Sequence, residues 1–200
     1  MGAKRPALRV IGGTLKGRRL RVPAGFEIRP TGDRVREALF DILGRDVDGA
    51  AFLDAYAGTG AVGVEALSRG ARLVAFVEKS PETVALLRQN LETAGELGAR
   101  TRVLGCDLAF ALRQLASDGA SFDIVYLDPP YEGGELDRAL RLVGQSSLLT
   151  ARGVVVAEHD VHSLLKGGGR LHAVRTVTYG NTALTFHHAA PGESPSMDTR

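Results

Sequence analysis

"AFLDAYAGTGAVGVEALSRGARLVAFVE", residues 51–78, decides the fold, because it holds two apolar runs on either side of a glycine-rich segment. The runs at 51–56 and 73–78 are nearly continuous in apolar residues, as is typical of strands buried on both faces of a sheet. Residues 61–69 between them have the pattern of a helix. A strand, a helix and a second strand in this order predict two parallel strands joined by a right-handed crossover.

The same alternation continues toward the C-terminus. Further strands are predicted at 101–106, 122–127 and 153–158, and helices at 81–95, 108–117 and 135–144. Residues 171–188 then read as two strands around Gly180 and Asn181, a pair that favours a hairpin turn. We therefore predict an α/β fold with a Rossmann-like seven-stranded sheet, which is mostly parallel and ends in a C-terminal antiparallel hairpin.

The first 45 residues do not follow this alternation. The runs LRVIGG (8–13) and RRLRVP (18–23) can pair as a small hairpin, and RPTGDRVREALFDIL (29–43) predicts a helix with Asp33 as its N-cap. Arg29, Pro30 and Thr31 are expected in the loop before that helix. We divide the chain into a basic N-terminal hairpin and helix at 1–45, an α/β domain at 46–190 and a disordered tail at 191–200.

Composition excludes several classes of protein. The chain has 200 residues, of which 44% are hydrophobic and 24% charged, as is typical of one folded globular domain. No apolar run approaches the roughly 18 residues that cross a bilayer, and the N-terminus lacks the apolar stretch of a secretory signal. A single cysteine, Cys106, cannot form an internal disulfide, so we expect a reducing cytoplasm. We also expect a monomer.

Positive charge is concentrated at the front of the chain. Residues 1–40 carry ten basic residues and three acidic ones, a net charge of +7, so the other 160 residues carry about −5 of the total of +2. A basic segment on a mildly acidic body favours a polyanionic partner. The alternative is a solvated surface tail with no partner.

A glycine-rich loop follows the first predicted strand. Gly58, Gly60 and Gly63 form a G-x-G-x-x-G match between that strand and a helix. Such a loop lets the backbone approach a ligand closely, and Glu78 at the end of the next strand can accept hydrogen bonds from two ribose hydroxyls. The pattern fits NAD, FAD and S-adenosylmethionine.

Two further acids help to separate these ligands. Asp54 ends the first strand, where it would be unfavourable beside a pyrophosphate but could face an ammonium group or organise the glycine loop. Asp107 follows the third strand and could accept from an adenine amino group. Together with Glu78 they suit S-adenosylmethionine better than a dinucleotide. The alternative is that each acid caps a helix.

The stretch FDIVYLDPPY, residues 122–131, is a buried strand that runs into Asp128, Pro129, Pro130 and Tyr131. In a parallel sheet, ligands bind beyond the carboxyl ends of the strands. Two prolines stiffen this loop, so Asp128 and a proline carbonyl can accept the hydrogens of a planar amine while Tyr131 stacks on its ring. The arrangement favours methylation of an exocyclic nucleobase amine through positioning and electrostatics. The alternatives are a strand that ends in two prolines beside a surface tyrosine, and a proline-rich docking peptide.

With these motifs, the sequence resembles the bacterial small-subunit (16S) ribosomal RNA guanine-N2 methyltransferases over about residues 8–188. The matching segments are RVIGGTLKGRRLRVP, RPTGDRVREALFDIL, FLDAYAGTGAVGVEALSRGA, FVEKSPE, DPPY and YGNTALTF. The chain departs from the family pattern at Gly32, where a second threonine is common, and at Tyr56, where phenylalanine is common.

The resemblance implies a seven-stranded methyltransferase fold, S-adenosylmethionine as cofactor, and transfer of its methyl group to N2 of a guanine in 16S ribosomal RNA, within an assembling small subunit. It assigns the cofactor to Thr31, Asp54, Ala57, Gly58, Thr59, Gly60, Glu78, Lys79, Asp107 and Leu108. It assigns the target base to Asp128, Pro129, Pro130 and Tyr131. The basic front segment becomes an RNA-binding extension through Lys16, Arg18, Arg19, Arg21, Arg29 and Arg34.

Other functions stay open at this point. A DNA amino-methyltransferase that makes N6-methyladenine or N4-methylcytosine would use DPPY equally well, although the chain has no room for a separate DNA-reading domain. A 5-methylcytosine mechanism is disfavoured because it needs a cysteine nucleophile, and Cys106 precedes Asp107 instead of following the fourth strand. A nucleic-acid-binding module without catalysis is the third reading. No cluster of residues has metal-ligand spacing, so we expect no metal.

Overall fold

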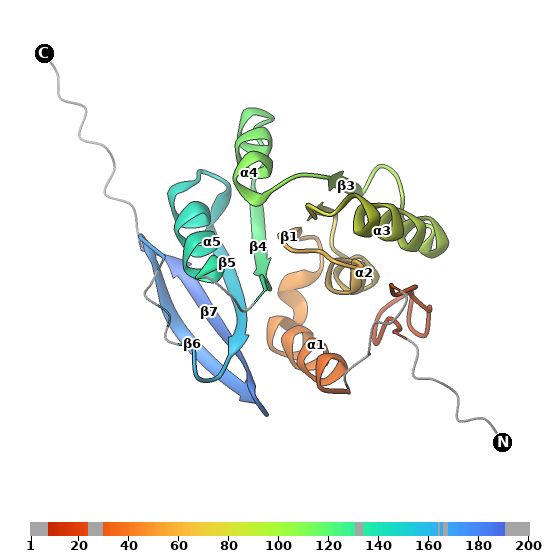
Figure 1. Cartoon of the computed structure of the whole chain (residues 1–200), viewed down its shortest axis with the longest axis horizontal. Coiled ribbons are helices and arrows are strands. Elements are labelled where there is room, and N and C mark those ends of the chain that lie inside the picture. The colour runs from red at the N-terminus through yellow and green to blue at the C-terminus, as the bar shows by residue number, and fades with distance from the viewer. Residues whose placement is uncertain (1–7, 24–29, 131–133, 164, 166–167, 191–200) are drawn as a thin grey trace, which may run out of the picture.

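The computed structural model describes residues 8–23, 30–130, 134–163, 165 and 168–190, except the side chains of residues 30 and 31. Helices cover both faces of one seven-stranded sheet (Figure 1). The helices are α1 (Pro30–Leu43), a short 3-10 helix η1 (Gly44–Val47), α2 (Ala61–Ser68), α3 (Pro81–Ala94), α4 (Leu108–Ser117) and α5 (Glu135–Gln145). The strands are β1 (Ala51–Asp54), β2 (Leu73–Val77), β3 (Thr101–Leu104), β4 (Phe122–Leu127), β5 (Leu149–Asp160), β6 (Leu171–Tyr179) and β7 (Thr182–Ala189).

The strand order β3-β2-β1-β4-β5-β7-β6 confirms the predicted fold class. The first five strands are parallel, whereas β7 runs antiparallel to β5 and to β6. Gly180 has a φ of +61° in the turn between β6 and β7, as the predicted hairpin requires. The chain order reverses between β1 and β4, so the edge beyond their carboxyl ends is where a ligand is expected in such a sheet.

Two hydrophobic cores form because successive strand residues face opposite sides of the sheet. Phe52 of β1 packs in the core beneath α1, α2 and α3, whereas its neighbours Ala51 and Leu53 pack in the core beneath α4 and α5. Figure 1 shows these two groups of helices on opposite sides of the strands. The near-continuous apolar runs of the sequence therefore correspond to strands covered on both faces, as predicted.

Strand β5 is longer than the sequence predicted. It begins at Leu149 instead of Gly153, and the register of its pairing with β4 shifts between Phe122 and Ile124. The added residues include Arg152, whose side chain is exposed. Residues 149–152, LTAR, are mixed in polarity and have no apolar run by which a strand could be recognised.

The start of α1 was predicted wrongly. The helix begins at Pro30 instead of after Asp33. Proline suits a first helical turn, because its φ is already helical and its missing N–H would have no partner there. Asp33 lies inside that turn and accepts a hydrogen bond from Arg36 at 3.0 Å. Thr31 thus belongs to the helix, while Arg29, Tyr131 and the predicted tail at 191–200 lie outside the described residues.

Residues 8–23, which we call the arm, form the predicted small hairpin. Arg9 and Arg19 make an antiparallel bridge. Val10 N–H donates to the carbonyl of Arg18 at 2.9 Å, and Leu20 N–H donates to that of Leu8 at 2.8 Å. The pairing is an isolated bridge and not a strand of the main sheet.

The arm is docked on helix α2 by a buried carboxylate. Glu65 is fully buried and accepts hydrogen bonds from the backbone N–H groups of Ile11 and Gly12, each at 2.7 Å. Arg69 donates to the same carboxylate at 2.9 Å. A buried charge needs such partners, so these bonds fix the front of the chain on the sheet domain. Figure 1 shows this red segment beside α2 and α3. No described helix is long and apolar enough to cross a membrane.

Candidate active site

Four acids lie at the carboxyl ends of neighbouring strands. Asp54 ends β1, Glu78 follows β2, Asp107 follows β3 and Asp128 follows β4. Because these strands are parallel neighbours, their ends meet at one edge of the sheet. The backbone therefore brings the four acids to the same edge of the sheet, as the sequence predicted.

Two cavities open at this edge, and Tyr56, Glu78 and Asp128 line both. The first, which we call the β3-side cavity, has a volume of about 470 Å³. Its other lining residues are Ala55, Val77, Lys79, Cys106, Asp107, Leu108, Ala109, Pro129, Pro130, Glu135, Arg138 and Leu142. The second, the β5-side cavity, has a volume of about 460 Å³ and is lined on its far side by Asp33, Arg36, Tyr126 and Glu158.

The glycine loop is held by the acids that the sequence singled out. Asp54 Oδ2 accepts from the backbone N–H of Gly63 at 2.9 Å, at the start of α2. Glu78 accepts from Gly58 N–H at 3.1 Å with one oxygen and from Ser80 N–H at 2.8 Å with the other. The Asp54 contact fits the predicted role of organising the glycine loop. Neither acid is a helix N-cap, which was the alternative, because Gly60 precedes α2 and Ser80 caps α3. Both side chains also line the β5-side cavity, so the structural role does not remove them from a ligand site.

Close packing explains why the loop contains glycines. Gly60 has a φ of +83°, and a Cβ there would lie 2.4 Å from Leu87 of α3. A Cβ on Gly63 would lie 2.1 Å from the ring of Phe76. Any side chain at either position would push α2 or α3 away from the sheet and reshape the cavity wall.

Asp54 is the most perturbed acid of the site. Burial raises its pKa to about 7, the hydrogen bond from Gly63 lowers it, and the nearby Glu78 carboxylate raises it further. The carboxyl is therefore poised between its neutral and charged forms near neutral pH. A cation placed beside it would favour the charged form.

Asp107 caps helix α4 at the far side of the β3-side cavity. Its Oδ1 accepts from Phe110 N–H at 2.9 Å, which is the capping role that the sequence had left as the alternative. Leu108 and Lys79 line the same cavity. Burial, and secondarily Asp107, raises the pKa of the Cys106 thiol, so this thiol is a weaker nucleophile than an unperturbed one.

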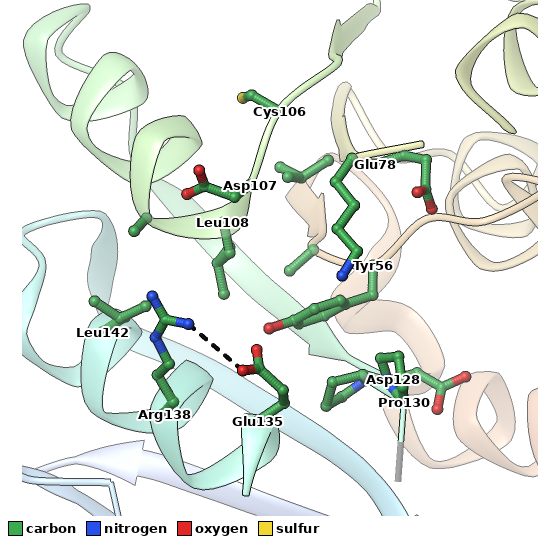
Figure 2. A pocket seen from close by; sticks show the side chains of 15 residues that line it. Tyr56, Glu78, Cys106, Asp107, Leu108, Asp128, Pro130, Glu135, Arg138 and Leu142 are labelled. Carbon is green, nitrogen blue, oxygen red and sulfur yellow. Dashed lines mark hydrogen bonds and ion pairs between the residues drawn. The ribbon is translucent and has the colours of Figure 1, made fainter. Parts of the chain in front are cut away.

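Three polar residues that line the β3-side cavity, Tyr56, Glu135 and Arg138, were not identified as site residues from the sequence. Tyr56 is half-buried, and burial together with Glu135 raises the pKa of its hydroxyl to about 12. Arg138 lies 3.4 Å from Glu135. Figure 2 shows the Tyr56 hydroxyl pointing toward Glu135, whereas the Asp128 carboxylate points to the opposite side, away from Glu135 and Arg138. No spacing in the sequence links Tyr56 to helix α5.

The DPPY segment forms the boundary between the two cavities. Asp128 is exposed and Pro129 is buried. Pro129 and Pro130 line the β3-side cavity, and Asp128 lines both cavities. The predicted stacking residue, Tyr131, lies outside the described residues.

A buried tyrosine and a half-buried glutamate form a pair in the β5-side cavity, which Asp128 also lines. The hydroxyl of Tyr126, on β4, donates to the carboxylate of Glu158, on β5. The pKa of Tyr126 is raised well above its usual value by burial, and then by Asp128 and Glu158, so it stays neutral. Sequence reasoning missed this pair, although Glu158 ends a predicted strand and could have been found as another acid at that edge.

The basic residues of the arm lie at the surface. The side chains of Lys16, Arg18, Arg19 and Arg21 are exposed, and so is that of Arg34 on α1. Arg18 donates to the carbonyl of Thr93 at 2.9 Å. Leu8 and Pro23 of the arm line the β5-side cavity, so the positive segment borders the site. Among the described residues, no three His, Cys, Asp or Glu side chains are grouped as metal ligands.

Comparisons with known proteins agree with this geometry. The chain matches the protein family described as "Conserved hypothetical protein 95" over residues 8–188. It is 38% identical over 181 residues to "Putative rRNA methyltransferase YlbH" of Bacillus subtilis, across 90% of this chain and 98% of the relative. It is 36% identical over 156 residues to "Ribosomal RNA small subunit methyltransferase D" of Escherichia coli K12, across 78% of this chain and 76% of the relative.

A solved structure has the same fold. The Escherichia coli protein titled "Putative methyltransferase yhhF" superposes with a TM-score of 0.79 at 32% identity, across 92% of this chain and 98% of the other. The sequence and structure matches together confirm the predicted methyltransferase fold and the resemblance to small-subunit rRNA methyltransferases.

Proposed function

Since the chain belongs to the family described as conserved hypothetical protein 95, we propose that it is an rRNA methyltransferase that uses S-adenosylmethionine and modifies the N2 amine of a guanine in small-subunit rRNA. The observation that carries this proposal is the junction of the two cavities. Glu78 and Asp128 line both, so a cofactor and a base can meet beside the DPPY carboxylate. The names of the relatives support ribosomal RNA as the substrate.

The charges and hydrogen-bond acceptors at the strand ends fit S-adenosylmethionine. Asp107 and Leu108 of the β3-side cavity would hold the adenine, and Glu78 would accept from the ribose hydroxyls. Asp54 and the backbone of the glycine loop, in the β5-side cavity, would hold the charged amino-acid end. When bound, the cofactor supplies an electrophilic methyl group on a positively charged sulfur.

The residues of the DPPY segment would position the amine. Asp128 and the Pro129 carbonyl would accept its two hydrogens, which directs the nitrogen lone pair at the methyl carbon. The bound cofactor would supply the methyl group, and the proton that the nitrogen gives up would pass to the Asp128 carboxylate, which already accepts that hydrogen. Because positive charge develops on the nitrogen, a carboxylate beside it stabilises the transition state.

The second acid of the β5-side cavity favours guanine. Guanine presents two adjacent donors, N1–H and the N2 amine, whereas adenine presents an amine beside the bare acceptor N1. Asp128 and Glu158 line one cavity, and two carboxylates match two adjacent donor groups. A carboxylate facing adenine N1 would leave two acceptors opposed, at a cost typical of unpaired buried polar groups.

The exposed basic side chains of the arm would bind the RNA backbone. Phosphate contacts position a protein on RNA without reading bases. A base inside a helix must also leave its stack to reach the cavity. These requirements fit a folded rRNA segment in an assembling subunit.

The proposal is tested by incubating the purified protein with S-adenosylmethionine and one of three substrates. These are naked small-subunit rRNA, small-subunit particles from a strain that lacks the gene, and duplex DNA. Digestion and mass spectrometry of nucleosides should show N2-methylguanosine in the rRNA samples only. N6-methyladenine or N4-methylcytosine in the DNA sample, with unmodified rRNA, would overturn the proposal and favour the DNA alternative.

A further inference from the structure

Asn90 connects the arm to the glycine loop through one side chain. This residue lies on α3 and is fully buried. Its Oδ1 accepts from the N–H of Arg21 at 2.7 Å, and its Nδ2 donates to the carbonyl of Arg21 at 3.0 Å. The second Nδ2 hydrogen goes to the carbonyl of Thr59 at 2.9 Å. Both amide hydrogens and the amide oxygen are thus used.

The geometry of this contact leaves little freedom. Because the N–H of Arg21 can only donate, it fixes which end of the amide is oxygen. The amide is planar, so a shift of Thr59 must either break a buried hydrogen bond or move Arg21 with it. An unpaired buried polar group is costly, which makes the joint movement the cheaper one.

The two ends of the contact belong to different parts of the proposed site. Thr59 lies between Gly58 and Gly60, in the loop that walls the β5-side cavity. Arg21 follows Arg18 and Arg19 in the exposed basic part of the arm. Helix α3 also packs on the loop directly, since Leu87 occupies the space where a Cβ of Gly60 would be.

We propose that Asn90 is a positioning residue that couples cofactor binding to RNA binding. This inference rests on the proposed function. A cofactor that orders the glycine loop also orders Thr59, Asn90 and the backbone of Arg21, so the arm is pre-arranged for phosphate contacts. By linkage, RNA held by the arm must strengthen cofactor binding by the same factor. Coupling of this kind needs no change of shape, because ordering alone carries it.

The test measures binding of a small-subunit rRNA transcript by filter retention, with and without saturating S-adenosylhomocysteine, and cofactor affinity by calorimetry with and without RNA. In the wild-type protein the cofactor product should tighten RNA binding about fivefold or more, and RNA should tighten cofactor binding equally. Two affinity ratios are compared, that of RNA with and without S-adenosylhomocysteine and that of S-adenosylhomocysteine with and without RNA. Asn90→Ala should bring both ratios close to one.

Ser68→Ala provides the matched control. Ser68 is also buried and also holds the arm, since its Oγ accepts from Leu15 N–H at 2.9 Å and donates to the Gly12 carbonyl at 2.5 Å. Among the described residues, the hydrogen bonds of its side chain reach only the arm. This variant should weaken RNA binding with and without cofactor alike, so the ratio stays at the wild-type value.

The outcomes are distinguishable. A wild-type ratio near one, or a wild-type ratio retained in Asn90→Ala, overturns the coupling even if the protein methylates rRNA. A wild-type protein that neither binds nor methylates rRNA overturns the proposed function and the coupling together. If Asn90→Ala does not fold, Asn90→Asp keeps the acceptor for Arg21 N–H but loses the donors to the carbonyls of Thr59 and Arg21, and should lower the ratio in the same way.

Discussion

Cofactor affinity should depend on pH through Asp54. Burial raises the pKa of this carboxyl to about 7, so in the free protein it becomes charged only as the pH rises through neutrality. The proposed cofactor carries an ammonium group that would favour the charged carboxylate. Binding below pH 7 must therefore release the Asp54 proton, and affinity should increase as the pH rises.

The size of this change in affinity follows from the fraction of the protein in which Asp54 is charged. With a pKa near 7, about one molecule in eleven is charged at pH 6 and about ten in eleven at pH 8. The apparent dissociation constant for S-adenosylhomocysteine should therefore fall about tenfold between pH 6 and pH 8. Above pH 8 this contribution should level off.

Isothermal titration calorimetry in buffers of different ionisation enthalpy measures both the affinity and the number of protons released. Asp54→Asn is the matched variant, because it keeps an oxygen for Gly63 N–H but cannot titrate. It should bind more weakly at pH 8 and lack the release of nearly one proton at pH 6. The same variant reports any pH dependence that comes from the ligand's own α-amino group.

The same pKa predicts how unfolding depends on pH. An unfolded aspartate titrates near 3.8, whereas the folded one titrates near 7, so the folded state binds more protons between these values. Stability should therefore decrease as the pH rises from about 4 to about 7 and then level off. Denaturant unfolding of the ligand-free protein should show this decrease, and Asp54→Asn should not.

If the wild-type affinity for S-adenosylhomocysteine and the number of protons released are the same at pH 6 and pH 8, the pKa assigned to Asp54 or its contact with the ligand is wrong.

Three further predictions concern the proposed reaction. Asp128→Ala should lower methyl transfer by two orders of magnitude or more, as is typical for loss of a transition-state contact, with cofactor affinity within a few-fold; near-normal turnover would contradict its role. Replacing Arg18, Arg19 and Arg21 by glutamine should weaken rRNA binding and lower the slope of log affinity against log salt by about two to three, and an unchanged slope would exclude phosphate contacts by these side chains. Glu158→Gln should lower kcat/KM on guanine by about tenfold or more, since an amide can turn a donor toward the base; unchanged activity and base preference would exclude Glu158 as a reader of guanine.

The sequence predicted the fold well because its main determinants are local. Strands covered on both faces leave unbroken apolar runs, and the helix predicted at 81–95 matches α3, which has the local start signals of an N-cap serine, Ser80, followed by Pro81. The exceptions have local explanations too. Pro30 is compatible with either a loop or a first helical turn, and the start of β5 at Leu149–Arg152, which is mixed in polarity, has no strand-like pattern.

The candidate site was predictable only in part. The acids at the strand ends could be found from the sequence, because the carboxyl ends of neighbouring parallel strands lie at the same edge of a sheet. The pair of Tyr126 and Glu158 depends on the pairing of β4 with β5, and the contact of Asn90 with Thr59 depends on how α3 lies over the glycine loop. Such contacts join residues 31 or 32 positions apart and have no spacing rule of their own.

The buried carboxylate of Glu65 makes the boundary near residue 45 a poor place to cut the chain. A fragment that starts there would lose the two backbone N–H groups that donate to this carboxylate, and would keep only Arg69 of the partners described above. We therefore expect such a fragment to be less stable than the whole chain, and the front hairpin to be difficult to exchange between relatives. We expect a chimera to fold only if the new hairpin offers backbone N–H groups at the Glu65 carboxylate. A basic surface alone would not be sufficient.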